Sequence, residues 1–305
     1  MKKLAVVGGA GGLGSTMGFY IGLKGLFQQI SLVDIKENIL RSHVMDMAQG
    51  LSELSRTEIS CGSWENLSGS DVVIITASVP ALKVASRNEF LKMNLGIVQA
   101  AAEQIGQYCP KAVVITATAP VDVYNYVFYK ILGGNPRRFI GFCRNDSLRL
   151  RWAVGQVLRE PTVENIEGWV LGEHGETQVP IYGSVKVNGK PAALTTEQIM
   201  RADASVKSWF TEFQSLDSGR TSSWTSTTSI TKVLEAVRAG SPTEYVPGSV
   251  ILEGQYGLKD VSLGVPVRLG PEGWHEVLEL ELTEAEQAAL EASAKHVRDL
   301  IDACL

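Results

Sequence analysis

A histidine between two glycines is the residue of this sequence best suited to transfer a proton. His174 lies in the segment GEHG, residues 172–175, directly after the apolar run of residues 166–171. A turn of this kind displays a side chain instead of burying it in a core, and an imidazole exchanges protons near neutral pH. A histidine in such a turn can also lack a catalytic role, so a catalytic role for His174 depends on the groups around it.

Two charged residues, Asp146 and Arg149, are candidates to act with this histidine. They lie three positions apart in a segment of helical periodicity, so both side chains can face one pocket. Asp146 would orient the imidazole and stabilise its charged form, and Arg149 would bind a carboxylate through two hydrogen bonds. The alternative is a surface ion pair on a helix that also carries Arg144 and Arg151.

A further candidate, Arg87, begins a predicted helix after the loop of residues 80–86. From this position its guanidinium could swing towards a substrate carbonyl and polarise it. The alternative is an ordinary solvated arginine.

The N-terminal stretch that must position these groups has the pattern strand, glycine turn, helix, strand, acid. In the turn, Gly8 permits a tight bend, Gly11 lets backbone approach a pyrophosphate, and Gly14 lets the helix pack on the sheet. The helix N-terminus faces the phosphates. Asp34, at the end of the second strand, can accept hydrogen bonds from ribose hydroxyls and would repel a 2′-phosphate, which favours NAD over NADP. The alternative is a structural turn with a solvated acid.

Strands and helices alternate over the first 140 residues or so, which is typical of a doubly wound parallel sheet. The expected strands are residues 4–7, 30–33, 57–61, 72–77, 112–117 and 138–141, and the expected helices are 15–25, 36–50, 87–108 and 121–132. Ligands of such sheets bind at the carboxyl ends of the strands, where Thr76, Ala77 and Ala119 lie.

After residue 143 the pattern changes to hairpins and long helices. We therefore expect two domains, an NAD-binding Rossmann domain of residues 1–143 and an α+β substrate domain of residues 144–305. A hairpin with its turn at Asn188-Gly189, antiparallel strands over residues 247–277 and a C-terminal helix from Thr283 are expected in the second domain.

Composition excludes several classes of partner. The net charge of −5 and the lack of a long basic run argue against nucleic acid and anionic membranes. No apolar stretch reaches the roughly 18 residues of a spanning helix, and the first strand begins too early to leave room for a signal peptide. The four cysteines lack paired spacing, which indicates reduced thiols in a cytoplasmic protein. No Cys/His cluster has metal-ligand spacing, so we expect no metal.

Together these segments resemble the lactate/malate dehydrogenase family along nearly the whole chain. The matching segments are VVGGAGGLG, SLVDI, VVIITAS, SRNEFLKMN, APVD, NDSLRLR, GEHGETQVP, PGSVILEGQYGLKDVSLGVPV and LTEAEQAALEASA. The resemblance implies an NAD-dependent oxidoreductase that transfers a hydride between nicotinamide and C2 of a 2-hydroxy acid or 2-oxo acid. It also implies a homodimer or homotetramer.

The resemblance also implies a role for each candidate residue. His174 would exchange the proton at the C2 oxygen while Asp146 holds its imidazole. Arg149 would bind the C1 carboxylate, and Arg87 would polarise the carbonyl after loop closure. The residues that would hold NAD are Gly8, Gly11, Gly14, Asp34, Thr76, Ala77 and Ala119.

The substrate pocket departs from the family pattern. Malate enzymes of the family carry Arg, and lactate enzymes Gln, where this chain has Ala81. A malate carboxylate would be desolvated there without a partner, at a cost of roughly 1–3 kcal/mol, unless Lys83 or Arg220 substitutes. We therefore expect a substrate that is neither malate nor plain lactate. Ala119 replaces an Asn of the family, and Ser222, in a hydroxyl-rich segment, is expected in the pocket wall.

Two other functions remain open on the sequence. A non-catalytic NAD-binding or sensing protein is favoured by the departures at Ser78 and Ala119, but the joint presence of the four candidate catalytic and substrate-binding residues speaks against it. An NAD-using glycosidase of related fold needs a metal, for which the chain has no ligand cluster.

Overall fold

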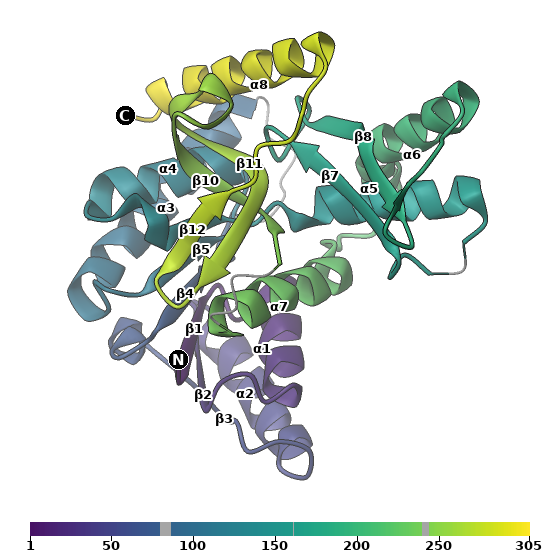
Figure 1. Cartoon of the computed structure of the whole chain (residues 1–305). Coiled ribbons are helices and arrows are strands. Elements are labelled where there is room, and N and C mark those ends of the chain that lie inside the picture. Colours follow the sequence, from purple (N-terminus) through teal and green to yellow (C-terminus); the bar gives the residue numbers. More distant parts are fainter. Residues whose placement is uncertain (80–86, 161, 240–243) are drawn as a thin grey trace.

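The structure is a computed structural model that describes residues 1–79, 87–160, 162–239 and 244–305, with the backbone alone for residues 87–90. Within these residues the central feature is a nine-stranded sheet of order β12-β11-β10-β6-β5-β4-β1-β2-β3 (Figure 1). Its parallel part consists of β1 (Lys3–Val7), β2 (Gln29–Val33), β3 (Glu58–Gly62), β4 (Val72–Ile75), β5 (Val113–Thr116) and β6 (Phe139–Gly141). The strand order reverses between β1 and β4, which is the switch point where such sheets bind ligands.

The remaining strands of this sheet come from the C-terminal part of the chain. They are β10 (Val246–Glu253), β11 (Lys259–Gly270) and β12 (Gly273–Val277), which pair antiparallel. β10 also pairs antiparallel with β6, at Ser249 and Gly141. Residues on both sides of the expected boundary at 143 therefore share one sheet, and the division into two domains there stays a prediction.

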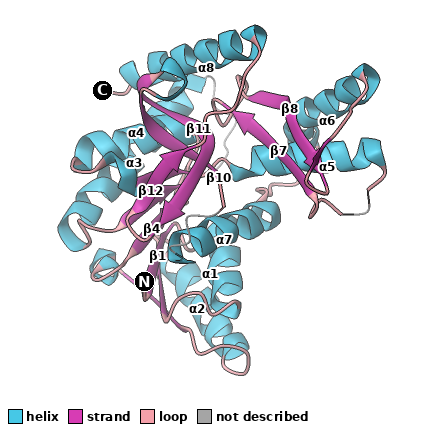
Figure 2. Ribbon diagram, viewed as in Figure 1, coloured by secondary structure: helices cyan, strands magenta, loops and turns pink. Residues whose placement is uncertain are grey.

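Helices cover both faces of the large sheet, as Figure 2 shows. α1 (Gly12–Leu23) and α2 (Glu37–Leu51) pack together, and so do α3 (Arg87–Tyr108) and α4 (Val121–Leu132). α7 (Ser223–Ala239) lies against α1, and α8 (Glu284–Asp302) lies against α4. Because both faces are covered, the central parallel strands are rich in Val, Ile and Leu, and all four side chains of β4 are fully buried.

A smaller unit lies beside the large sheet, at the right of Figure 1. Its three-stranded sheet consists of β7 (Ile166–Leu171), β8 (Val179–Val187) and β9 (Lys190–Pro191). α5 (Arg144–Leu158) packs on β7, and α6 (Thr196–Ser215) packs on α5. This unit has its own apolar core, which includes Leu150, Val154, Ile166, Val170, Val185 and Val206.

The doubly wound sheet followed by α+β elements, as expected from the sequence, is confirmed. The expected hairpin turn at residues 188–189 and the capping box at Thr283 and Glu286 are also present. α1 begins at Gly12, three residues before the expected start, because the glycine turn itself forms the first helical turn. β8 is longer than expected and begins at Val179.

Two observations concern expected absences. Among the described residues, no helix has the length and apolar character needed to cross a bilayer. The same residues contain no group of three His, Cys, Asp or Glu side chains that could hold a metal ion.

One contact between two glycines joins the two sheets. The amide of Gly172, just after β7, donates to the carbonyl of Gly264 in β11 at 3.0 Å, and the Gly264 amide donates back at 2.9 Å. A Cβ at Gly264 would lie 2.9 Å from the Gly172 carbonyl oxygen and 3.1 Å from Sγ of Cys143. Only glycine at position 264 leaves room for this approach.

We predict that Gly264→Ala lowers the free energy of unfolding by about 1–3 kcal/mol, because an overpacked methyl must push backbone apart. Urea denaturation of the purified protein measures the change. The matched control is Gly183→Ala in β8, where a Cβ meets nothing within 4 Å. Equal stability of the two variants would contradict a tight contact at Gly264.

Candidate active site

The glycine turn lies at the switch point between β1 and β4. Gly8 has a φ of +95°, and the Thr76 hydroxyl donates to the carbonyls of Val7 at 3.0 Å and Gly8 at 3.2 Å. A Cβ at Gly8 would lie 2.5 Å from the amide of Ala77, and a Cβ at Gly14 would lie 2.3 Å from the Gly8 carbonyl oxygen. The structure therefore brings Gly8, Gly14, Thr76 and Ala77 together, as the sequence predicted.

The first turn of α1 opens to solvent without side-chain cover. Gly11 is its N-cap, with extended backbone, and both Gly11 and Gly12 are exposed. Backbone N–H groups and the positive end of the helix dipole thus face outward over the turn. This bare helix N-terminus fits the pyrophosphate of a dinucleotide.

Asp34 lies beside the same turn. Its Oδ2 accepts from the amide of Ala10 and its Oδ1 from the amide of Lys36, both at 3.0 Å. A carboxylate has about four acceptor positions, so two remain for ribose hydroxyls. A surface pocket of about 430 Å³ lined by residues 35–39 begins directly after it, and Ile35 there is 88% exposed.

The loop after β5, which carries Thr118 and Ala119, also lies at this site. Thr118 donates from its hydroxyl to the carbonyl of Ala77 at 2.8 Å, so the loop that carries Ala119 contacts the end of β4. Ala119 is exposed and precedes Pro120 through a cis peptide bond. Ala81 and the side chain of Arg87 lie outside the described residues.

A buried carboxylate brings the candidate acid–base and substrate-binding groups together. Asp146 Oδ2 is 2.5 Å from Nδ1 of His174, and its Oδ1 accepts from Nη1 of Arg149 at 3.3 Å. The Asp146 side chain is 6% exposed, against 22% for His174 and 15% for Arg149. Asp146 and Arg149 on α5 thus lie together with His174 in the turn after β7, as the sequence predicted.

The charge state of His174 depends on two carboxylates. Burial alone would lower its pKa, but the charge and hydrogen bond of Asp146 and the charge of Asp122 raise the pKa above the ordinary value. Nδ1 is engaged by Asp146, so Nε2 is the ring nitrogen left to exchange a proton with a ligand. An imidazole held in this way favours its protonated form over a wider pH range.

The second carboxylate, Asp122, holds the backbone of His174. Its Oδ2 accepts from the His174 amide at 2.7 Å, and its Oδ1 accepts from the Ser249 hydroxyl at 2.6 Å. Ser249 in turn contacts the hydroxyl of Ser262, which accepts from the Asn125 amide group. Burial raises the pKa of Asp122 to about 6, although the Ser249 hydrogen bond opposes this. The buried network ties the histidine loop to α4, β10 and β11.

Arg149 has one face against an aromatic ring and one donor without a partner. Its Cζ lies 4.2 Å from the ring centre of Trp209 on α6. Its Nε is buried and has no hydrogen-bond partner among the described residues. Burial lowers the pKa of the guanidinium, and the charge of Asp146 partly offsets this.

The hydroxyl-rich start of α7 lies between the glycine turn and α5. A Cβ at Gly12 would be 3.7 Å from the hydroxyl of Thr221. One turn further, the Ser226 hydroxyl accepts from the Asn145 amide group at 2.8 Å. Ser222 is half-buried and lies in the chain between Thr221 and Ser226. It is therefore placed between the glycine turn and α5, the helix that carries Asp146.

Asp122 and Trp209 were not expected at this site from the sequence. An acid in the first turn of a helix is ordinarily a solvated N-terminal residue, and only the apolar neighbours over 121–128 indicated that Asp122 is buried. Trp209 and Phe213 have i,i+4 spacing, which indicates a shared helix face but not what that face contacts.

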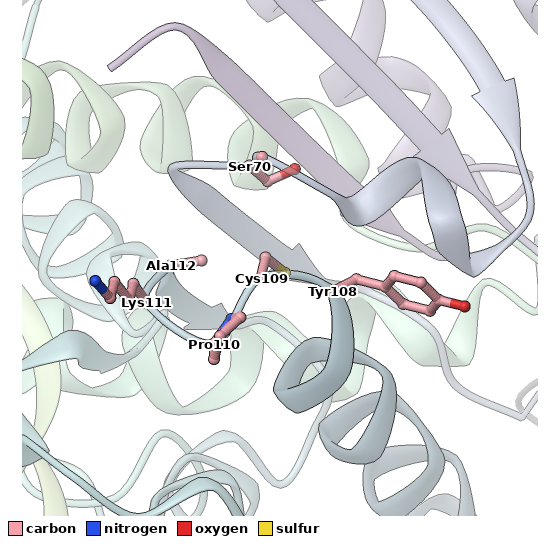
Figure 3. Close-up of a pocket in the computed structure, with 7 residues that line it drawn as sticks. Ser70, Tyr108, Cys109, Pro110, Lys111 and Ala112 are labelled. Carbon is pink, nitrogen blue, oxygen red and sulfur yellow. The ribbon is translucent and has the colours of Figure 1, made fainter.

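A separate pocket of about 270 Å³ lies away from these groups (Figure 3). Its lining residues include Ser70, Cys109 and Ala112, which precede β4 and β5. It therefore lies at the amino-terminal edge of the parallel strands, opposite to the glycine turn, and is not part of the candidate active site.

Comparisons with known proteins cover nearly the whole chain. The family model for the lactate/malate dehydrogenase NAD binding domain matches residues 2–141, and the model for the alpha/beta C-terminal domain of the same family matches residues 144–305. A malate dehydrogenase of Halobacterium salinarum is 32% identical, with 97% of each chain covered.

Solved structures agree with these matches. A malate dehydrogenase from Cryptosporidium parvum superimposes with a TM-score of 0.92 at 28% identity, covering 99% of this chain and 98% of the other. A lactate dehydrogenase from the same organism, complexed with lactic acid and nicotinamide adenine dinucleotide, gives 0.93 at 30% identity with the same coverage.

We predict that Asp146→Asn lowers the pKa of His174, because the variant removes the carboxylate charge that opposes the effect of burial. NMR titration of the imidazole signals measures the pKa, and the spectrum of His174→Asn assigns the signal. Since the folded pKa is raised, the contact stabilises the fold below the unfolded pKa, and this contribution is lost as pH rises through the folded pKa. Asp146→Asn should reduce that contribution.

The control for this titration is Asp203→Asn, which removes an ion pair with Lys207 on α6. It should leave the His174 signal unchanged. A His174 pKa that is the same in Asp146→Asn and in the unmodified protein would show that Asp146 does not set the charge of the imidazole.

Proposed function

This chain belongs to the lactate/malate dehydrogenase family, and we propose that it transfers a hydride between nicotinamide and C2 of a 2-hydroxy acid or 2-oxo acid. The observation that supports this most directly is the contact of His174 and Arg149 with one buried carboxylate, Asp146. That arrangement combines a proton donor and a carboxylate receptor. A non-catalytic NAD-binding protein would have no use for both.

In this proposal His174 moves the proton. During reduction of a 2-oxo acid, Nε2 donates its proton to the C2 oxygen, and during oxidation it accepts the hydroxyl proton. Asp146 accepts from Nδ1 and stabilises the imidazolium, while Asp122 holds the backbone of the same residue. NAD, when bound, supplies the hydride chemistry, and the protein supplies orientation and electrostatics.

Arg149 binds the C1 carboxylate in this proposal. Asp146 accepts from its Nη1, and the buried Nε–H remains for a ligand. A carboxylate is the ligand that a guanidinium edge binds best, through charge-assisted hydrogen bonds. Arg87, at the start of α3, is proposed to polarise the substrate carbonyl, as the family resemblance implies.

The cofactor contacts divide between the two halves of NAD. We assign the pyrophosphate and ribose to Gly8, Gly11, Gly14 and Asp34, and the nicotinamide half to Thr76, Ala77 and Ala119. The bare N-terminus of α1 and the free acceptor positions of Asp34 support the first assignment. The contacts of Thr76 and Thr118 at the strand ends support the second.

The relatives do not support the expectation that malate is disfavoured. Several of them are named malate dehydrogenase, and a similar solved structure is a lactate dehydrogenase. The expectation depends on Ala81, which lies outside the described residues. We retain it as a proposal, together with a role of Ser222 in the pocket wall, and test it by substitution.

Assembly and location complete the proposal. We propose a cytoplasmic homodimer or homotetramer, supported by exposed apolar side chains on neighbouring helices, Phe19 and Leu23 on α1 and Ile39 and Met45 on α2. Light scattering of the purified protein measures the subunit number, and a monomer at micromolar concentration would contradict this assembly.

We predict that His174→Asn lowers kcat for 2-oxo acid reduction by about 10²–10⁴, the usual contribution of a general acid. NADH affinity, measured by fluorescence titration, should stay within twofold. The control is His43→Asn on α2, which should keep full activity. Full turnover by His174→Asn would contradict the assigned role, and tight NADH binding without turnover of any acid by the unmodified protein would favour the non-catalytic alternative.

We predict that Ala81→Arg raises kcat/KM for oxaloacetate by about tenfold or more, because a hydrogen bond to a charged group is worth about 1.5–3 kcal/mol. Steady-state assays with NADH measure it. Leu82→Arg, one position along, is the control for register. High oxaloacetate activity in the unmodified protein would overturn the expectation against malate, and no change in Ala81→Arg would show that position 81 does not face the substrate.

A further inference from the structure

Two aromatic rings of α6 lie against the substrate-binding arginine. The ring centre of Trp209 is 4.2 Å from Cζ of Arg149, and Phe213, one turn later, stacks on Trp209 with ring centres 5.2 Å apart and planes within 11°. We call Trp209 and Phe213 the aromatic shelf.

The aromatic shelf and Asp146 together restrict the guanidinium of Arg149. Trp209 lies over the planar guanidinium, whose N–H donors lie in its plane and point along its edges. Asp146 takes one edge through Nη1. The buried Nε–H, on another edge, has no partner among the described residues and is left for a carboxylate.

The surroundings of Arg149 favour an apolar group beside the bound carboxylate. The face of an aromatic ring carries partial negative charge and repels a second carboxylate. The other two arginines of α5 each donate to a neutral acceptor, Arg144 to the Ser229 hydroxyl and Arg151 to the Ser147 carbonyl. A second carboxylate beside the ring face of Trp209 would lose water against an apolar surface.

We propose that Trp209 positions the Arg149 guanidinium and, with Phe213, forms an apolar wall that selects 2-oxo acids with an aromatic or branched apolar tail. This inference rests on the proposed function, because it assumes that Arg149 binds the C1 carboxylate. Trp209 contacts the guanidinium that would bind this carboxylate, and we assign the space beside the indole to the tail. Trp209 is thus a positioning and specificity residue that acts beside the catalytic groups.

The test compares Trp209→Ala and Trp209→Phe in steady-state reduction of pyruvate, phenylpyruvate and oxaloacetate by NADH. Trp209→Ala should raise KM about tenfold for each acid that is turned over, with kcat within threefold. It should also lower the kcat/KM ratio of phenylpyruvate to pyruvate about tenfold. Trp209→Phe keeps a flat ring over Arg149 and should restore KM to within threefold.

The control variant is Trp152→Leu, which alters an exposed tryptophan on α5. It should leave KM and the substrate ratio unchanged. A Trp209→Ala protein that folds, binds NADH normally and keeps both values would overturn the proposal, as would an unmodified protein that prefers oxaloacetate to phenylpyruvate tenfold or more.

Failure of the proposed function gives a different result. In that case the unmodified protein reduces none of the three acids, and calorimetric binding of phenylpyruvate to the NADH complex becomes the measurement. Binding that weakens about tenfold in Trp209→Ala supports the aromatic shelf, and equal or absent binding in both proteins overturns it.

Discussion

The candidate site depends on one shared carboxylate. Asp146 is almost completely buried, and each of its oxygens contacts a different cation-forming group, His174 through Oδ2 and Arg149 through Oδ1. A buried carboxylate without such partners would be strongly unfavourable. The partners come from two elements, α5 and the loop after β7, so the carboxylate also sets how these elements lie against each other. Removal of either partner would leave the buried carboxylate with the other as its one remaining cation-forming partner among these two.

The histidine loop is held on its other side by the large sheet. Asp122 of α4 binds the His174 amide, and the reciprocal hydrogen bonds of Gly172 and Gly264 hold the strand end just before it. The side chain of His174 is therefore positioned by the smaller unit and its backbone by the larger one. A site at this junction is partly closed to water, which explains why burial affects the pKa of His174, Asp122 and Arg149.

The cofactor side of the site follows a different principle. There the groups available to a ligand are mainly backbone N–H groups. Gly8 and Gly14 leave no space for a Cβ, and Gly11 and Gly12 leave the start of α1 without side chains. Oriented N–H groups attract phosphate without a buried charge. In the proposed function the two halves of the site use complementary electrostatics, a polarised helix terminus for the dinucleotide and a paired guanidinium for the acid.

The sequence by itself determined the elements and several of the groups. Continuous Val and Ile runs predicted the buried parallel strands, the glycine spacing predicted the dinucleotide turn, and the i,i+3 spacing of Asp146 and Arg149 predicted a shared pocket with His174. Tertiary structure alone decided that β10 to β12 extend the same sheet, that Asp122 lies under the His174 backbone and that Trp209 covers Arg149. Contacts of this kind join segments tens of residues apart, and they depend on how helices and sheets pack, which leaves no periodic signal in either segment.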